Sequence, residues 1–161
     1  MAVSAIVQET GQQSTTANSY VTEAGYNQYL EDRYDRSAPA SNVNLRYIYR
    51  AMSYFESLDF IGEKATEDQA LQWPRSRVRI DGYGFENTEI PNEVLVAIYE
   101  IAYGYEQGYG IDAPVPRETL KEKVNGVEVT YKNSSASRTL LPAASQALRK
   151  LVNNPMRTVR V

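Results

Sequence analysis

Apolar residues recur at helical spacing in two long stretches of the chain. In each stretch they stand at the i, i+3, i+4, i+7 positions that give a helix one buried face. The first stretch contains Leu45, Ile48, Tyr49, Met52 and Phe55, and the second contains Val94, Ala97, Ile98, Ile101, Ala102 and Tyr105. The pattern predicts helices over residues 41–58 and 91–107, and a third over 22–33 that begins after the helix-capping residue Thr22.

Between and after these helices the pattern changes to short alternating and polar runs. Asn125-Gly126 separates two alternating runs, which predicts a β-hairpin near 120–132. A short helix is expected over 67–72 and another over 142–152. The sequence thus predicts a mainly α fold: a small helical bundle of three principal helices, with an attached β-hairpin and an extended C-terminal arm.

The same pattern divides the chain into three parts. Residues 1–19 form an N-terminal arm, and residues 20–132 form the helical domain with its hairpin. Residues 133–161 form a flexible linker, a short helix and a basic C-terminal arm.

Composition narrows the chemistry that the chain can carry. Its 161 residues include no cysteine and no histidine, which removes thiolate chemistry and the usual general base and metal ligand at neutral pH. Acidic residues that are adjacent in the sequence do not converge on one face of a helix, so they form no catalytic pair of carboxylates. No glycine-containing segment has the spacing of a phosphate-binding loop. We therefore expect no enzyme, no metal and no cofactor. No run of 18 apolar residues is present, so no membrane partner is expected.

Charge is distributed unevenly along the chain. The net charge is -3, but the segment from Arg138 to Val161 holds five basic residues and no acidic ones. Such a segment favours contact with an acidic partner or with another copy of the chain. A solvated basic tail explains the same charges equally well.

The only tryptophan precedes a proline and a series of arginines. Trp73 and Pro74 predict a structural corner, because the residue before proline favours extended backbone, and we expect the indole to be a packing anchor. Arg75, Arg77 and Arg79 then alternate with smaller residues, which would place three guanidinium groups on one side of a strand. They could contact phosphates, an acidic neighbouring subunit, or solvent only.

Tyrosine is unusually abundant, with 13 residues. On the two strongest helices the spacing places Tyr49 and Tyr105 inward, and it places four others partly outward: Tyr47, Tyr54, Tyr99 and Tyr103. Outward tyrosines suit subunit interfaces, and they also suit stacking on the bases of single-stranded nucleic acid. An ordinary helix surface is the third interpretation.

Four motifs together resemble a known family. They are Ala17-Asn-Ser-Tyr-Val-Thr22, Gln69-Ala-Leu-Gln-Trp-Pro-Arg-Ser76, Ile90-Pro-Asn-Glu-Val94 and Lys121-Glu-Lys-Val-Asn-Gly-Val-Glu-Val129. In this combination the chain, from about Ala17 to Tyr131, is similar to small tailed-phage proteins labelled DnaT-like single-stranded-DNA-binding proteins. Members of that family act as the head-to-tail connector, or adaptor, docked on the portal.

The resemblance implies a virion structural protein. Its expected form is a homo-oligomer, a dodecameric ring at the head–tail junction. During assembly the protein is expected in the host cytoplasm. Its expected partners are the portal protein, further copies of itself, a downstream neck or tail protein, and genomic double-stranded DNA in the lumen. The alternative is a single-stranded-DNA-binding replication accessory protein that uses the tyrosines and arginines above. Net acidity argues against that alternative.

Under the adaptor interpretation, the last segment is the expected portal-docking arm. It mixes apolar residues and cations, which suits a groove on an acidic partner. The residues assigned to docking are Leu148, Arg149, Lys150, Leu151, Val152, Met156, Arg157, Val159, Arg160 and Val161.

Overall fold

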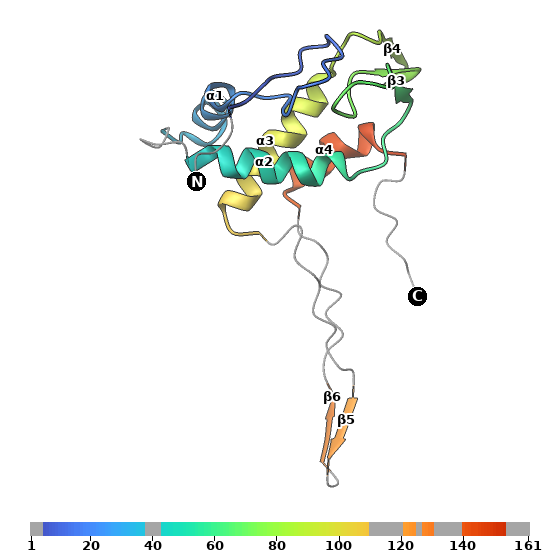
Figure 1. Ribbon diagram of the computed structural model, residues 1–161. Coiled ribbons are helices and arrows are strands. Elements are labelled where there is room, and N and C mark those ends of the chain that lie inside the picture. The colour runs from blue at the N-terminus through green and yellow to red at the C-terminus, as the bar shows by residue number, and fades with distance from the viewer. Residues whose placement is uncertain (1–4, 38–42, 110–120, 125–126, 131–139, 154–161) are drawn as a thin grey trace.

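A computed structural model describes residues 5–37, 43–109, 121–124, 127–130 and 140–153 (Figure 1). In chain order its elements are α1 (Glu23–Tyr34), α2 (Val43–Glu56), β1 (Glu63–Lys64), β2 (Arg75–Ser76), β3 (Val78–Ile80), β4 (Tyr83–Phe85), α3 (Asn92–Glu106), β5 (Lys121–Val124), β6 (Val127–Thr130) and α4 (Pro142–Leu151). The fold is mainly α, as the hydrophobic pattern predicts.

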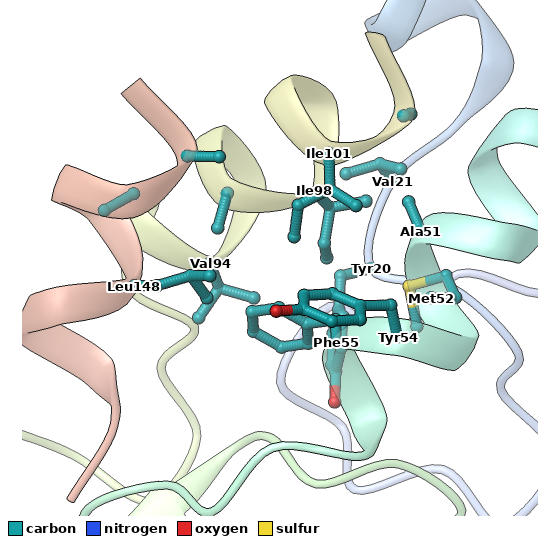
Figure 2. Close-up of a cluster of buried hydrophobic side chains, with 14 of the residues drawn as sticks. Tyr20, Val21, Ala51, Met52, Tyr54, Phe55, Val94, Ile98, Ile101 and Leu148 are labelled. Carbon is teal, nitrogen blue, oxygen red and sulfur yellow. The ribbon is translucent and has the colours of Figure 1, made fainter. Parts of the chain in front are cut away.

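Helix α3 is the centre of the body and packs against both α2 and α4 (Figure 1). The core between these helices consists of buried apolar side chains. Figure 2 shows side chains from α2, α3, α4 and the segment before α1 converging on one cluster. Its labelled members are Tyr20, Val21, Ala51, Met52, Tyr54, Phe55, Val94, Ile98, Ile101 and Leu148.

Helix α4 differs from the expectation, because the sequence groups it with a C-terminal arm. Its apolar residues share one face, and Ala144, Ala147, Leu148 and Leu151 are buried. Arg149 and Lys150 are exposed. Because the apolar and the charged residues lie on different faces, α4 packs its apolar face on α3 and completes the core. Leu148 and Leu151 are therefore not available to dock on a partner, and their assignment to a docking arm is wrong.

Helix α1 begins as its sequence predicts. The Thr22 hydroxyl accepts a hydrogen bond from the backbone N–H of Gly25 at 3.0 Å, which satisfies one of the free donors of the first turn. The short helix expected over 67–72 is absent. There the side chain of Gln69 is buried and donates to the carbonyls of Leu71 and Pro74, so it replaces the backbone bonds that a helix would make.

In the described part of the chain the strands form three separate two-stranded antiparallel sheets, β1–β2, β3–β4 and β5–β6. The expected hairpin is β5–β6, in which Lys121 pairs with Thr130 and Val124 pairs with Val127. In β3–β4, Val78 pairs with Phe85 and Ile80 with Tyr83. The two residues that join β3 to β4, Asp81 and Gly82, both have positive φ (52° and 89°), as a tight two-residue hairpin turn requires.

Candidate nucleic-acid interface

The predicted corner is a buried junction. Trp73 has no exposed surface, and its peptide bond to Pro74 is cis. The indole meets Phe60 edge to face, with ring centroids 5.9 Å apart. The backbone N–H of Trp73 donates to the Tyr20 hydroxyl at 2.8 Å. The structure thus places Trp73 inside the protein, where it cannot stack on a ligand.

A hydrogen-bond relay fixes this corner to two other parts of the chain. The Tyr20 hydroxyl donates to Oε1 of Glu56 at 2.7 Å, and Oε2 of Glu56 accepts from the backbone N–H of Gln72 at 2.8 Å. Tyr20 precedes α1 and Glu56 ends α2, so the segment before α1, the end of α2 and the corner are held together. Burial raises the pKa of the Glu56 carboxyl and of the Tyr20 hydroxyl above their usual values.

Arg75 serves this framework and does not face solvent. It is 8% exposed, and its guanidinium donates to the carbonyls of Ile61 and Gly62, each at 2.8 Å, and to Oε1 of Gln72 at 2.9 Å. Burial lowers the pKa of Arg75. The expectation that Arg75 contacts DNA or a neighbouring subunit is therefore wrong, because the guanidinium N–H groups already donate to oxygen atoms of the same chain.

Arg77 separates the two short strands and breaks the predicted alternation. Its φ is 59°, in the left-handed region, so the chain turns between β2 and β3 and the three arginines do not share one side of a strand. Gly62 passes close by: a Cβ there would lie 2.4 Å from the Ser76 carbonyl oxygen. The Arg77 side chain is 78% exposed and forms an ion pair with Oε1 of Glu63 at 2.9 Å.

The β3–β4 hairpin presents a cation and an aromatic ring to solvent. Arg79 is exposed and donates to the Gly82 carbonyl at 3.0 Å. Its cross-strand partner is Gly84, where an added Cβ would meet nothing within 4 Å. Tyr83 is 78% exposed, whereas Val78 and Ile80 anchor the hairpin in the core. We call Arg77, Arg79 and Tyr83 the hairpin surface. Tyr83 pairs with Ile80 next to the turn, so its ring leaves the ladder on the face opposite to Arg79.

The C-terminal end of α4 adjoins this hairpin (Figure 1). Nζ of Lys150 lies 2.6 Å from Oδ2 of Asp81, in the hairpin turn, and 3.4 Å from Oε1 of Glu93, in the first turn of α3. Hydrogen bonds to these two carboxylates raise the pKa of the Lys150 ammonium. Arg149 is exposed on the same turn of α4. Lys150 therefore ties the hairpin to the helical body and neutralises the carboxylate of the turn.

The tyrosines singled out from the sequence are mostly engaged within the protein. Tyr54 is buried in the core, and Tyr47 is half-buried. Tyr99 stacks on Tyr26 and Tyr29, with centroids 6.1 and 4.8 Å apart. Tyr103 stacks on Tyr34 at 4.2 Å. For Tyr54 this corrects the expectation of an outward ring, because the α2 stripe is wide enough to include it. Tyr105 is buried as predicted, and Tyr49 is half-buried.

Two buried or nearly buried carboxylates hold the α1 tyrosines against α3. Glu100 has no exposed surface and accepts from the hydroxyls of Tyr29 and Tyr34, and it pairs with Nε of Arg33 at 2.8 Å. Glu106 similarly binds the Tyr26 hydroxyl and both terminal nitrogens of Arg36. We call this group of rings, carboxylates and arginines the α1–α3 cluster. The arginines of this cluster therefore form ion pairs with the carboxylates of the same cluster.

Little of the expected docking arm can be placed on the surface. Val152 is half-buried and forms a β-bridge with Phe60. The remaining assigned residues, Met156, Arg157, Val159, Arg160 and Val161, lie outside the described residues. Tyr83, the most exposed tyrosine of the described chain, was missed by the sequence reasoning. The signal for it is an aromatic residue next to a tight turn, where few neighbours can cover it.

The described residues contain no cluster of acidic side chains that could hold a metal ion. No helix among them is long and apolar enough to cross a membrane.

A family model described as "Putative DnaT-like ssDNA binding protein" matches residues 4–161, which is nearly the whole chain. No curated protein and no solved structure matches it. The family description overturns the adaptor interpretation. Five expectations are therefore wrong. They are a dodecameric ring, a portal partner, a neck or tail partner, genomic DNA in a lumen, and a place at the head–tail junction of a virion. The finding favours the alternative, a single-stranded-DNA-binding role in replication.

Proposed function

We propose that this chain, which belongs to the DnaT-like ssDNA-binding family, binds single-stranded DNA as an accessory to replication. The binding site in this proposal is the hairpin surface formed by Arg77, Arg79 and Tyr83. The proposed activity is binding alone, since no nucleophile with a base to activate it stands on this surface.

The observation that carries the proposal is the exposure of Tyr83. Tyr83 is 78% exposed at the end of a hairpin whose other apolar residues are buried, as Val78 and Ile80 are, or half-buried, as Phe85 is. An aromatic ring left in water at a fixed position can stack on an unpaired base, and every base offers such a face. Stacking of this kind gives affinity without strong sequence preference.

Two exposed arginines support the same surface, although the exposed acids Asp81, Glu86 and Glu89 lie in and after the hairpin. Arg79 donates only to a backbone carbonyl among the described contacts, and the single carboxylate bound to Arg77 is itself exposed. Both guanidinium groups can therefore reach backbone phosphates. The overall negative charge of the protein weakens long-range attraction, but a strand held by stacking needs only a few phosphate contacts.

The α1–α3 cluster is the other aromatic and basic surface, and it suits DNA less well. Its rings already stack on each other, and Arg33 and Arg36 pair with Glu100 and Glu106. Moving these cations to a phosphate would leave buried carboxylates unpaired, which is costly. The hairpin surface carries no such penalty.

The proposal is tested by titrating a fluorescently labelled oligo(dT) with the protein and following anisotropy. Tyr83→Ala should weaken binding by about 1–3 kcal/mol, the contribution of one stacked base. Tyr83→Phe should bind like the wild type, because the ring and not the hydroxyl makes the contact. Tyr109→Ala is the matched control, because Tyr109 is also exposed but follows α3, away from the hairpin. Equal losses for Tyr83→Ala and Tyr109→Ala would refute the assignment.

Salt dependence tests the role of the cations. The logarithm of the affinity should fall with the logarithm of salt concentration, with a slope of about -0.7 for each phosphate neutralised on a single strand. Arg79→Ala should therefore reduce the slope by about 0.7. Arg46→Ala, which removes an exposed cation from α2, should leave the slope unchanged.

A further inference from the structure

One cation of the hairpin surface is already held by an acid. Nη1 of Arg77 lies 2.9 Å from Oε1 of Glu63, at the start of β1. Both side chains are exposed, 78% for Arg77 and 64% for Glu63. Glu63 pairs with Ser76 across the β1–β2 ladder, so its carboxylate is positioned by the strand next to the residue that it binds.

A carboxylate and a phosphate compete for the same face of a guanidinium. Both present paired oxygens to its planar N–H groups, so Arg77 cannot bind both fully at once. Water screens an exposed ion pair, and such pairs exchange partners at small cost. Glu63 thus occupies the guanidinium group that a phosphate of the strand would bind.

The backbone supports a role for Arg77 beyond this ion pair. Its φ of 59° disfavours any residue with a Cβ, and strain of this kind is enriched at functional sites. The close approach of Gly62 to Ser76 fixes the turn on which Arg77 stands. The side chain is exposed at this turn, within reach of Glu63.

We infer that Glu63 is a built-in competitor for the phosphate that Arg77 binds. This inference rests on the proposed function, because it assigns a regulator to the same surface. In the free protein the carboxylate occupies Arg77. A DNA strand must displace it, so the Arg77 contact adds less to the affinity than an unpaired arginine would. The competition lowers the affinity for single-stranded DNA.

The experiment compares two substitutions that change the net charge equally. Glu63→Gln removes the competitor, and Glu31→Gln removes an exposed carboxylate from α1, away from the hairpin. In the anisotropy titration with oligo(dT) at fixed salt, Glu63→Gln should tighten binding about 1.5- to 5-fold, the range expected for release of an exposed ion pair. Glu31→Gln should change it much less.

A double-mutant comparison assigns the effect to Arg77. In an Arg77→Gly background, whose backbone accepts the left-handed conformation, Glu63→Gln should no longer tighten binding. Equal gains from Glu63→Gln and Glu31→Gln, or a gain that persists without Arg77, would overturn the inference. If the wild type binds oligo(dT) but Glu63→Gln leaves the affinity unchanged, only this inference fails. If neither protein binds, the proposed function fails with it. Thermal melting of each variant shows whether the fold is retained.

Discussion

At the scale of single residues, the three arginines after the corner have three different environments. Arg75 is buried among carbonyls, Arg77 is exposed on a left-handed residue, and Arg79 is exposed on a strand. Sequence alternation alone predicts that they are equivalent. The backbone conformation of one residue, which the spacing of side chains cannot reveal, makes them different.

Arg77 offers a test that separates stability from binding. Arg77→Ala keeps a Cβ in the left-handed conformation, whereas Arg77→Gly removes it. The glycine variant should therefore be more stable than the alanine variant by about 1 kcal/mol. Both should lose affinity for oligo(dT) to the same extent, because both lack the guanidinium. Urea denaturation and anisotropy measure the two effects. Equal stability of the two variants would show that the backbone relaxes at this position.

At the scale of elements, α4 is part of the core. Leu151 has no exposed surface, and Gln146 lies exposed on the same helix. Leu151→Ala should reduce the free energy of unfolding by about 2–5 kcal/mol through lost packing and a residual cavity. Gln146→Ala should change it by no more than about 0.5 kcal/mol. Similar small effects from both substitutions in chemical denaturation would mean that α4 contributes little to the folded state.

The elements also show what could be read from the sequence. The apolar stripes of α2 and α3, the Thr22 cap of α1 and the β5–β6 strand pair follow from local sequence patterns, so they could be predicted. The irregular segment around Gln69 could not, because a side chain there takes over the backbone bonds. The place of α4 could not either, since an amphipathic helix fits its own core and a partner's groove equally well.

The candidate site was predictable only in part. Arg77 and Arg79 could be identified from the sequence, but Tyr83 could not, because exposure depends on which neighbours the fold brings to it. The outward assignment of Tyr54 was wrong, and Tyr99 and Tyr103 are covered in part by Tyr29 and Tyr34 from α1. Contacts between helices far apart in the sequence are not encoded in the periodicity of either helix.

At the scale of the whole molecule, the Glu56 relay joins the segment before α1, the end of α2 and the corner. Burial raises the pKa of Glu56 above its usual value of 4.5, so the folded protein holds the proton more tightly than the unfolded chain. The stability that this carboxyl contributes is present at acid pH and is lost as pH rises through its folded pKa.

This linkage gives a pH prediction. Glu56→Gln removes the titrating group and keeps the rest of the chain. The free energy of unfolding of the wild type, minus that of Glu56→Gln, should decrease as pH rises from about 4 toward 7. Denaturant titrations at several pH values measure it, and contributions common to both proteins cancel. A difference that stays flat or increases with pH would contradict the raised pKa.

The open space above Gly84 makes the protein easy to label beside the proposed strand. The chain has no cysteine, so Gly84→Cys would introduce a unique thiol. The position has no positive φ, and an added Cβ would meet nothing within 4 Å. A small fluorophore or spin label attached there would stand across the ladder from Arg79. Its emission or mobility would then report the arrival of a nucleotide directly, without a label on the DNA.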